Sequence, residues 1–168
     1  MILYHGTAAP LRFIKEDGLK VFSKEYFMRL MVSRVRDPKR LGPVIARILS
    51  GIVSGEAVEK AIYFTTDKEM AKAYIGIPEQ LGYQFAIGPK RVALELWRAL
   101  VEVEGDFLVG KVVTVDVPDE WKDKPGVNWE PSDEISFPWD VGPEYITKIE
   151  VISFPWVEIV AGVEELID

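Results

Sequence analysis

The order of strand-like and helix-like segments constrains the fold of this chain more than any other feature of its sequence. Residues 1–5 and 61–66 are short apolar runs typical of β-strands, and residues 110–118 form a Val-rich run that Pro118 stops. Helix-like segments interrupt these runs at irregular intervals, without the regular strand–helix–strand alternation of a parallel sheet. This order predicts an α+β fold.

Helical spacing and turn residues predict the remaining elements. Leu11 and Ile14 share one face of a helix over 9–19 that Gly18 ends. Thr66 is expected to cap a later helix, with Glu69 closing a capping box. The other expected elements are a helical hairpin over about residues 20–58, a helix over 90–104, a polar loop over 118–133, strands over 134–137 and 146–154, and a helix over 157–168.

Composition limits the kinds of site that the chain can carry. The 168 residues are 48% hydrophobic, so residues 1–168 are expected to fold as a single domain with a substantial core. The chain has no cysteine and a single histidine, His5, so no disulfide and no metal site is expected. The phosphate-binding patterns GxGxxG and GxxxxGK[ST] are absent. The scarcity of asparagine and glutamine resembles thermophile composition.

Charge is unevenly distributed along the chain. The net charge is −7, yet residues 20–47 contain eight basic and two acidic side chains, a local balance of +6. This segment could bind a nucleic acid or phosphorylated acceptor, and its alternative interpretation is a solvated helix face. Neither a signal peptide nor a membrane-spanning stretch is recognised, so a cytoplasmic protein without a membrane partner is expected.

Four short motifs change the interpretation of His5, which taken alone would more often be structural. They are YHGT (4–7), IYFTT (62–66), AKAYIG (71–76) and SDEISFPWDVGPEYI (132–146). Together they resemble the ADP-ribosyltransferase superfamily over most of the chain, with residues 20–58 and 77–108 outside the resemblance. The resemblance implies a split β-sandwich with helices, in which 20–58 is a helical insertion after the first helix. It also implies an enzyme that cleaves the nicotinamide–ribose bond of NAD.

The resemblance also implies roles for the motif residues. His5 would be both catalytic and NAD-binding, with its imidazole bonded to hydroxyls of NAD, and the backbone of Gly6 would pair with the nicotinamide amide. Thr7 would also belong to the NAD-binding residues. Tyr63 and Tyr74 would sandwich the nicotinamide, because electron-rich aromatic faces suit a ring that carries positive charge before cleavage. NAD is thus the expected substrate, and ADP-ribose would pass to an acceptor that the sequence does not identify.

Two glutamates compete for the catalytic position that the family places late in the chain. Glu134, which opens EISF, is favoured, and Glu144, inside PEYI, is the runner-up. A fixed carboxylate there would stabilise the positive charge that develops on the ribose as the bond breaks. Ser132 stands where many members carry a second Glu or Gln, which makes arginine a less suitable acceptor. Trp121 and Trp129 could contact a substrate or cover the core.

Three alternatives remain open at this point. RNA 2′-phosphotransferases of the same superfamily share HGT and a late PEYI-like segment, but they carry an arginine just before HGT that residues 1–4 lack. A non-catalytic NAD-binding or nucleotide-binding module could keep the same fold. In an unrelated α+β protein, Tyr63 and Tyr74 would simply be core aromatics.

Overall fold

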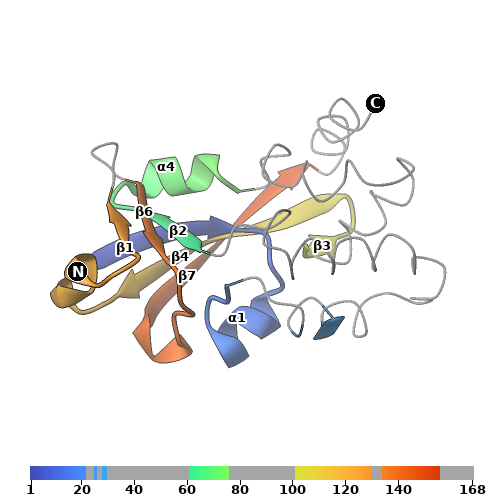
Figure 1. Cartoon of the computed structure of the whole chain (residues 1–168). Coiled ribbons are helices and arrows are strands. Elements are labelled where there is room, and N and C mark those ends of the chain that lie inside the picture. Colours follow the sequence, from blue (N-terminus) through green and yellow to red (C-terminus); the bar gives the residue numbers. More distant parts are fainter. Residues whose placement is uncertain (22–24, 26–27, 30–60, 76–100, 130–133, 156–168) are drawn as a thin grey trace, which may run out of the picture.

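The computed structural model of the chain describes residues 1–21, 25, 28–29, 61–75, 101–129 and 134–155 (Figure 1). Its helices and strands, in chain order, are β1 (Ile2–Thr7), α1 (Leu11–Asp17), β2 (Ile62–Thr65), α4 (Lys68–Ala73), β3 (Val103–Glu104), β4 (Phe107–Asp116), a 3-10 helix (Asp119–Asp123), β5 (Asn128–Trp129), β6 (Glu134–Phe137), a 3-10 helix (Pro143–Tyr145) and β7 (Ile146–Pro155). A mixed α+β architecture follows, as the sequence predicts.

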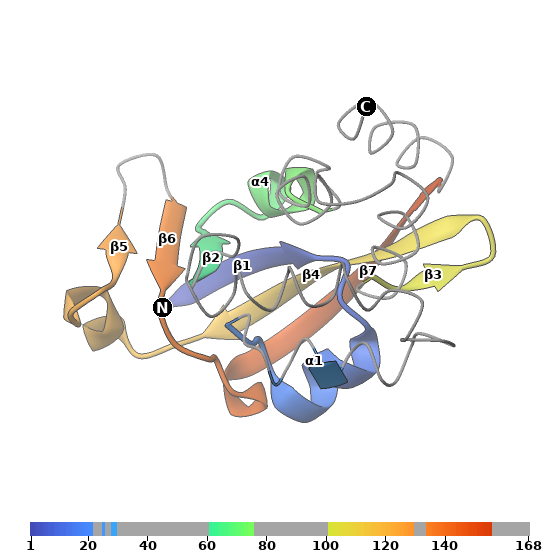
Figure 2. The ribbon, with the colours of Figure 1, turned by 45° about the vertical axis from the view of Figure 1, so that its right-hand side comes forward.

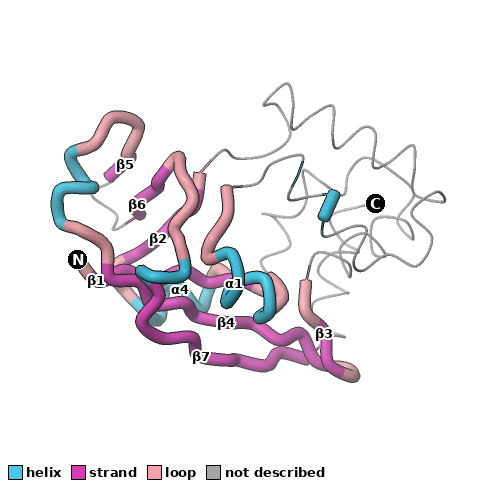
Figure 3. The backbone as a smooth tube through the Cα atoms, turned by 90° about the horizontal axis from the view of Figure 1, so that it is seen from below, coloured by secondary structure: helices cyan, strands magenta, loops and turns pink. Residues whose placement is uncertain are grey.

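The strands form one antiparallel sheet. Its order is β3-β4-β1-β2-β6-β5, and β7 also pairs with β4. The long strands β4 and β7 pair from Phe107 opposite Pro155 to Val115 opposite Ile146, with a shift of register between Thr114 and Val115. Figure 3 shows β5, β6, β2, β1, β4 and β7 in this succession. Strands that lie far apart in the sequence are therefore neighbours, because β2 lies between β1 and β6.

The sheet is divided at the junction of β1 and β2. All six residues of β1 are in register with β4, from Ile2 opposite Asp116 to Thr7 opposite Lys111. With β2, by contrast, β1 shares one registered pair, Tyr4 opposite Thr65. The strands β4, β1 and β7 thus form one half of the sheet and β2, β6 and β5 the other, with a short ladder joining them.

Side chains alternate between the two faces of the sheet, and each face has its own helix (Figure 2). On the α1 face, Leu3, Phe64 and Val113 pack with Ile14 of the helix. On the α4 face, Val112 packs with Ala71 of α4 and with Ile75, which follows the helix. Tyr4, Ile152 and Phe154 are partly buried and pack against this smaller cluster. The strands consequently hold two apolar layers, one under each helix.

Two glycines have positions that a side chain could not occupy. A Cβ on Gly6 would lie 2.0 Å from the carbonyl oxygen of Ala71, so the absence of a side chain lets α4 approach β1. Gly18 has φ 75° and ends α1, where its N–H donates to the carbonyl oxygen of Ile14. The sequence predicts this end of α1 correctly.

Several predicted boundaries are wrong. Asp67, not Thr66, caps α4, because its side chain accepts from the N–H of Glu69. The helix expected over 90–104 does not extend to its end, since Val103 and Glu104 form β3. The stretch 118–133 is not wholly a loop, because it contains the 3-10 helix Asp119–Asp123 and β5.

Other predicted elements lie mainly or wholly outside the described residues. The helical hairpin over 20–58 is one of them, although Glu25, Met28 and Arg29 are helical. The C-terminal helix over 157–168 is another. None of the described helices is both long and apolar enough to cross a membrane.

Candidate functional site

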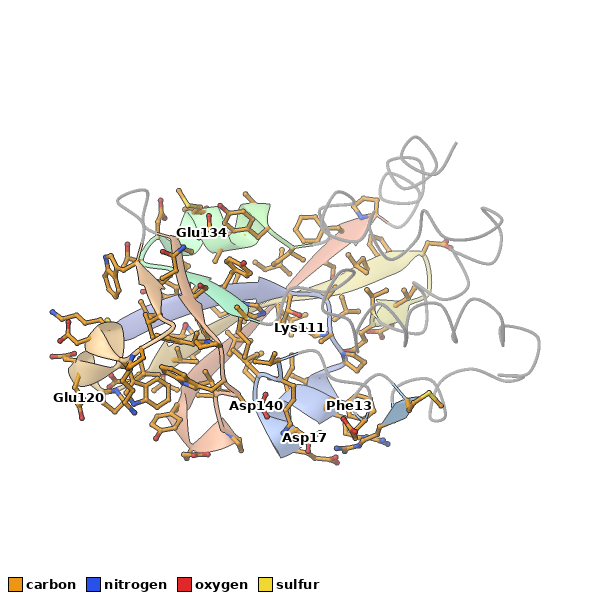
Figure 4. All side chains as sticks on the ribbon, viewed as in Figure 1. Phe13, Asp17, Lys111, Glu120, Glu134 and Asp140 are labelled. Carbon is orange, nitrogen blue, oxygen red and sulfur yellow. The ribbon has the colours of Figure 1, made fainter. Side chains whose placement is uncertain are left out.

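The sheet brings three motif-bearing strands side by side. His5 lies on β1, Tyr63 on β2 and Glu134 at the start of β6. β2 pairs with both β1 and β6. His5 and Glu134, which are 129 positions apart in the sequence, therefore lie only two strands apart in the sheet. Figure 4 shows Glu134 at the α4 end of β6.

Tyr63 and Glu134 project from the same face of this sheet. Tyr63 is opposite Ser136 and Thr65 is opposite Glu134 in the antiparallel β2–β6 register. Ile62 and Phe64 are buried in the core of the α1 face, so Tyr63 and Thr65 project toward the α4 face, and Glu134 and Ser136 project with them. Diagonal neighbours in such a ladder have side chains about 7–8 Å apart. The Glu134 carboxylate is partly exposed and forms no hydrogen bond or ion pair with another described residue.

Tyr74 lies at the end of α4, on the side of the helix toward β2. Met70 lies one turn earlier, and its Sδ accepts from the hydroxyl of Thr65 on β2, 3.6 Å away. Residues four apart lie on one stripe of a helix, so Tyr74 follows Met70 on this stripe. Lys68, on the other side of α4, instead bonds to Glu150 of β7. Tyr74 thus borders the face that carries Tyr63.

His5, on β1, contacts residues of β2 across the division between the two halves of the sheet. Its Nδ1 lies 2.6 Å from the carbonyl oxygen of Tyr63, and its ring packs against Phe64 at 5.5 Å between centroids. Removal of the ring from solvent lowers the pKa of His5 below its ordinary value, and the bond to the Tyr63 carbonyl offsets this only in part. A carbonyl only accepts, so the neutral ring carries its proton on Nδ1 and leaves Nε2 as an acceptor.

The backbone of Gly6 points into the same division. Val117 donates its N–H to the carbonyl oxygen of Met1, which shows that odd-numbered residues of β1 direct their peptide groups toward β4. The peptide groups of Tyr4 and Gly6 therefore point toward β2, where Tyr4 has a registered partner and Gly6 has none. The hydroxyl of Thr7 accepts from the N–H of Ala9, 3.1 Å away, and so shapes the turn that follows.

Glu144 lies in a different part of the molecule. It is exposed, in the 3-10 helix just before β7, and this helix contacts α1. The strand β7 is separated from β2 by β4 and β1. Glu144 is accordingly remote from Tyr63 in the sheet, whereas Glu134 is on the adjacent strand.

The two tryptophans of 118–133 have different surroundings. Trp121 is buried and packs edge-on against Phe137, Trp139 and Tyr145. It therefore covers the core of the α1 face. Trp129, on the edge strand β5, is 43% exposed.

Two basic side chains of 20–47 take part in contacts within the chain. Lys20 pairs with Asp140 at 3.0 Å. Arg29 pairs with Glu16 and Asp17 of α1, and its guanidinium lies over the ring of Phe13. These two charges are offset by carboxylates, and the other basic residues of the segment lie outside the described residues.

The structure adds polar residues that the sequence interpretation does not single out. Ser136 stands opposite both Tyr63 and Asn128, so these three form one row across the α4 face of β2, β6 and β5. The alternation of EISF predicts that Ser136 shares a face with Glu134, but only the strand order places it beside Tyr63. Lys111 is a second polar residue that the sequence interpretation does not single out. The feature of the sequence that could have identified it is a charged side chain within a Val-rich strand.

The described residues contain no group of three or more acidic or histidine side chains that could hold a metal ion. The chain matches no known family model, and no curated protein matches it.

Proposed function

We propose that this protein is an NAD-dependent ADP-ribosyltransferase that cleaves the nicotinamide–ribose bond. The observation that carries the proposal is the strand order β1-β2-β6, in which Tyr63 and Glu134 share the α4 face while the His5 ring, on the α1 face, reaches the carbonyl oxygen of Tyr63 across the division. The split β-sandwich of that superfamily is part of the proposal, and the single registered pair between β1 and β2 supports it.

The groups around the division suit the nicotinamide riboside end of NAD. The Gly6 peptide group offers one donor and one acceptor, as a primary amide requires. His5 offers Nε2 as an acceptor for a ribose hydroxyl, because Tyr63 holds the proton on Nδ1. Tyr63 and Tyr74 border the same face, so their rings can enclose a cationic nicotinamide.

Glu134 supplies the negative charge in this proposal. Cleavage of the glycosidic bond moves its electron pair to nicotinamide, and positive charge develops on the ribose. A carboxylate that is already fixed beside the ribose stabilises this charge without reorganisation of solvent. The acceptor oxygen or nitrogen then bonds to the ribose carbon and loses its proton.

Release of nicotinamide from NAD, measured for wild type, Glu134→Gln and Glu144→Gln, tests the proposal. We expect Glu134→Gln to lower kcat by about 10²–10³-fold, with a much smaller change in KM, because the carboxylate acts mainly in the transition state. Glu144→Gln is the matched control, since it removes the same charge far from Tyr63, and it should retain activity.

Two outcomes would contradict the proposal. Loss of release in Glu144→Gln alone would move the catalytic role to that residue. A wild-type protein that neither releases nicotinamide, with or without added nucleic acid and cell extract, nor shows calorimetric binding of NAD would not be an NAD-cleaving enzyme.

A further inference from the structure

A lysine is buried within the apolar strand β4. Lys111 is 0% exposed, although its neighbours along the strand are glycine and valine. Its Nζ donates to the carbonyl oxygen of Ala9 at 2.7 Å and to the carboxylate of Glu102. Figure 4 shows Lys111 close to α1. A charge in this position is costly to bury unless its partners are fixed.

Glu102 connects this lysine to the segment that follows β1. Its carboxylate accepts from the N–H of Leu11 at 2.7 Å, which satisfies a free donor at the start of α1. Its own N–H donates to the carbonyl oxygen of Ala8 at 2.8 Å, and its carbonyl accepts from Val109. The Lys111 ammonium thus holds Ala9 and the Glu102 carboxylate holds Leu11, while the backbone N–H of Glu102 holds Ala8.

This network begins directly after the proposed NAD-binding residues. Lys111 is opposite Thr7 and Val113 is opposite His5, so Lys111 and His5 share the α1 face as diagonal neighbours. Such neighbours have side chains about 7–8 Å apart. The chain leaves β1 after Thr7, and the bonds to Ala9 and Leu11 hold the residues that directly follow this end of the strand.

We propose that Glu102 and Lys111 are a positioning pair that holds the His5–Gly6 end of β1 in the geometry for NAD. This inference rests on the proposed function. A buried ion pair adds little net stability compared with apolar residues of the same size, whereas it favours one arrangement of its partners. The pair touches neither nicotinamide nor ribose in this proposal. It acts through the peptide groups of Ala9 and Leu11.

The test uses the double variant Glu102→Gln/Lys111→Met. The glutamine oxygen can still accept from Leu11, and replacement of both residues avoids leaving the Lys111 charge buried without its partner, which would be strongly destabilising. The control is Lys68→Met/Glu150→Gln, which removes an ion pair between α4 and β7. Thermal unfolding of both variants, the kcat and KM of nicotinamide release, and the ¹⁵N shifts of the His5 imidazole would be measured.

We expect the Glu102/Lys111 variant to raise KM for NAD by about 10- to 100-fold, since a small displacement of binding groups has effects of this size. Its Nδ1 resonance should also shift, because the bond from His5 to Tyr63 would weaken. In the control variant, both the KM for NAD and the Nδ1 resonance of His5 should stay as in the wild type. A variant that loses stability but keeps both KM and the imidazole shifts would overturn the proposal.

Failure of the proposed NAD cleavage can be distinguished from failure of the positioning role of Glu102 and Lys111. If the wild type releases no nicotinamide, the imidazole shifts and the Gly6 amide resonance still report on the end of β1. Unchanged resonances in the Glu102/Lys111 variant would overturn the positioning role, and shifted ones would support it without any NAD chemistry.

Discussion

His5 has surroundings that favour its neutral form. Desolvation lowers its pKa, and the acceptor that faces Nδ1 selects one tautomer of the neutral ring. We predict that the imidazole titrates below its ordinary value of 6.5. Because the chain has one histidine, a single set of imidazole resonances in an NMR titration measures this value directly. A midpoint at or above 6.5 would contradict the burial of the ring.

The sign of the effect on stability follows from that shift. Well above pH 6.5 the ring is neutral in both states and contributes no pH dependence. As the pH falls below this value, the unfolded chain binds a proton that the folded chain excludes, so the free energy of unfolding decreases until the folded pKa is reached. The variant His5→Asn should lack this loss as the pH falls below 6.5. Glu150, whose pKa Lys68 lowers, is present in both proteins and cancels in the comparison.

At the scale of elements, the cap of α4 shows how local a prediction error can be. Asp67 has extended backbone geometry and accepts from the N–H of Glu69 at 2.9 Å, whereas Thr66 is exposed outside the helix. Asp67→Ala should decrease the free energy of unfolding by about 0.5–2 kcal/mol. Thr66→Ala is the matched control and should change it by less than about 0.5 kcal/mol. Chemical denaturation measures both, and equal losses would contradict the assignment of the cap.

The strands were predictable where their side chains alternate or form unbroken β-branched runs. β2 and β6 fall within residues 61–66 and 134–137, and β4 overlaps the predicted strand 110–118 but begins earlier, at Phe107, because burial on one or both faces leaves that pattern in the sequence. β3 was not predictable, since Val103–Glu104 continues a stretch of good helix formers and becomes a strand only through its pairing with Leu108 and Phe107. Propensity is overridden there by a tertiary contact.

At the scale of the whole molecule, the candidate site depends on strand order, which no local pattern reveals. The resemblance of the motifs to a known family identifies Tyr63 and Glu134 as candidates, but their common face follows from β2 pairing with β6. The same holds for Lys111, because Glu102 and Ala9 reach it only when β1 and β4 are in register. Residue types could therefore be predicted, whereas their mutual positions could not.

The division between the two halves of the sheet predicts an uneven pattern of amide exchange along β1. The N–H groups of His5 and Thr7 point toward β4 and should exchange slowly, whereas the N–H of Gly6 points into the division and should exchange faster than both. Residue-resolved hydrogen exchange by NMR measures this difference. Saturating NAD should slow exchange at Gly6 selectively, because the nicotinamide amide would accept from this N–H. Equal protection of the three amides without NAD would mean that β2 continues along β1 past Tyr4. Protection that NAD leaves unchanged would mean that Gly6 does not hold the nicotinamide.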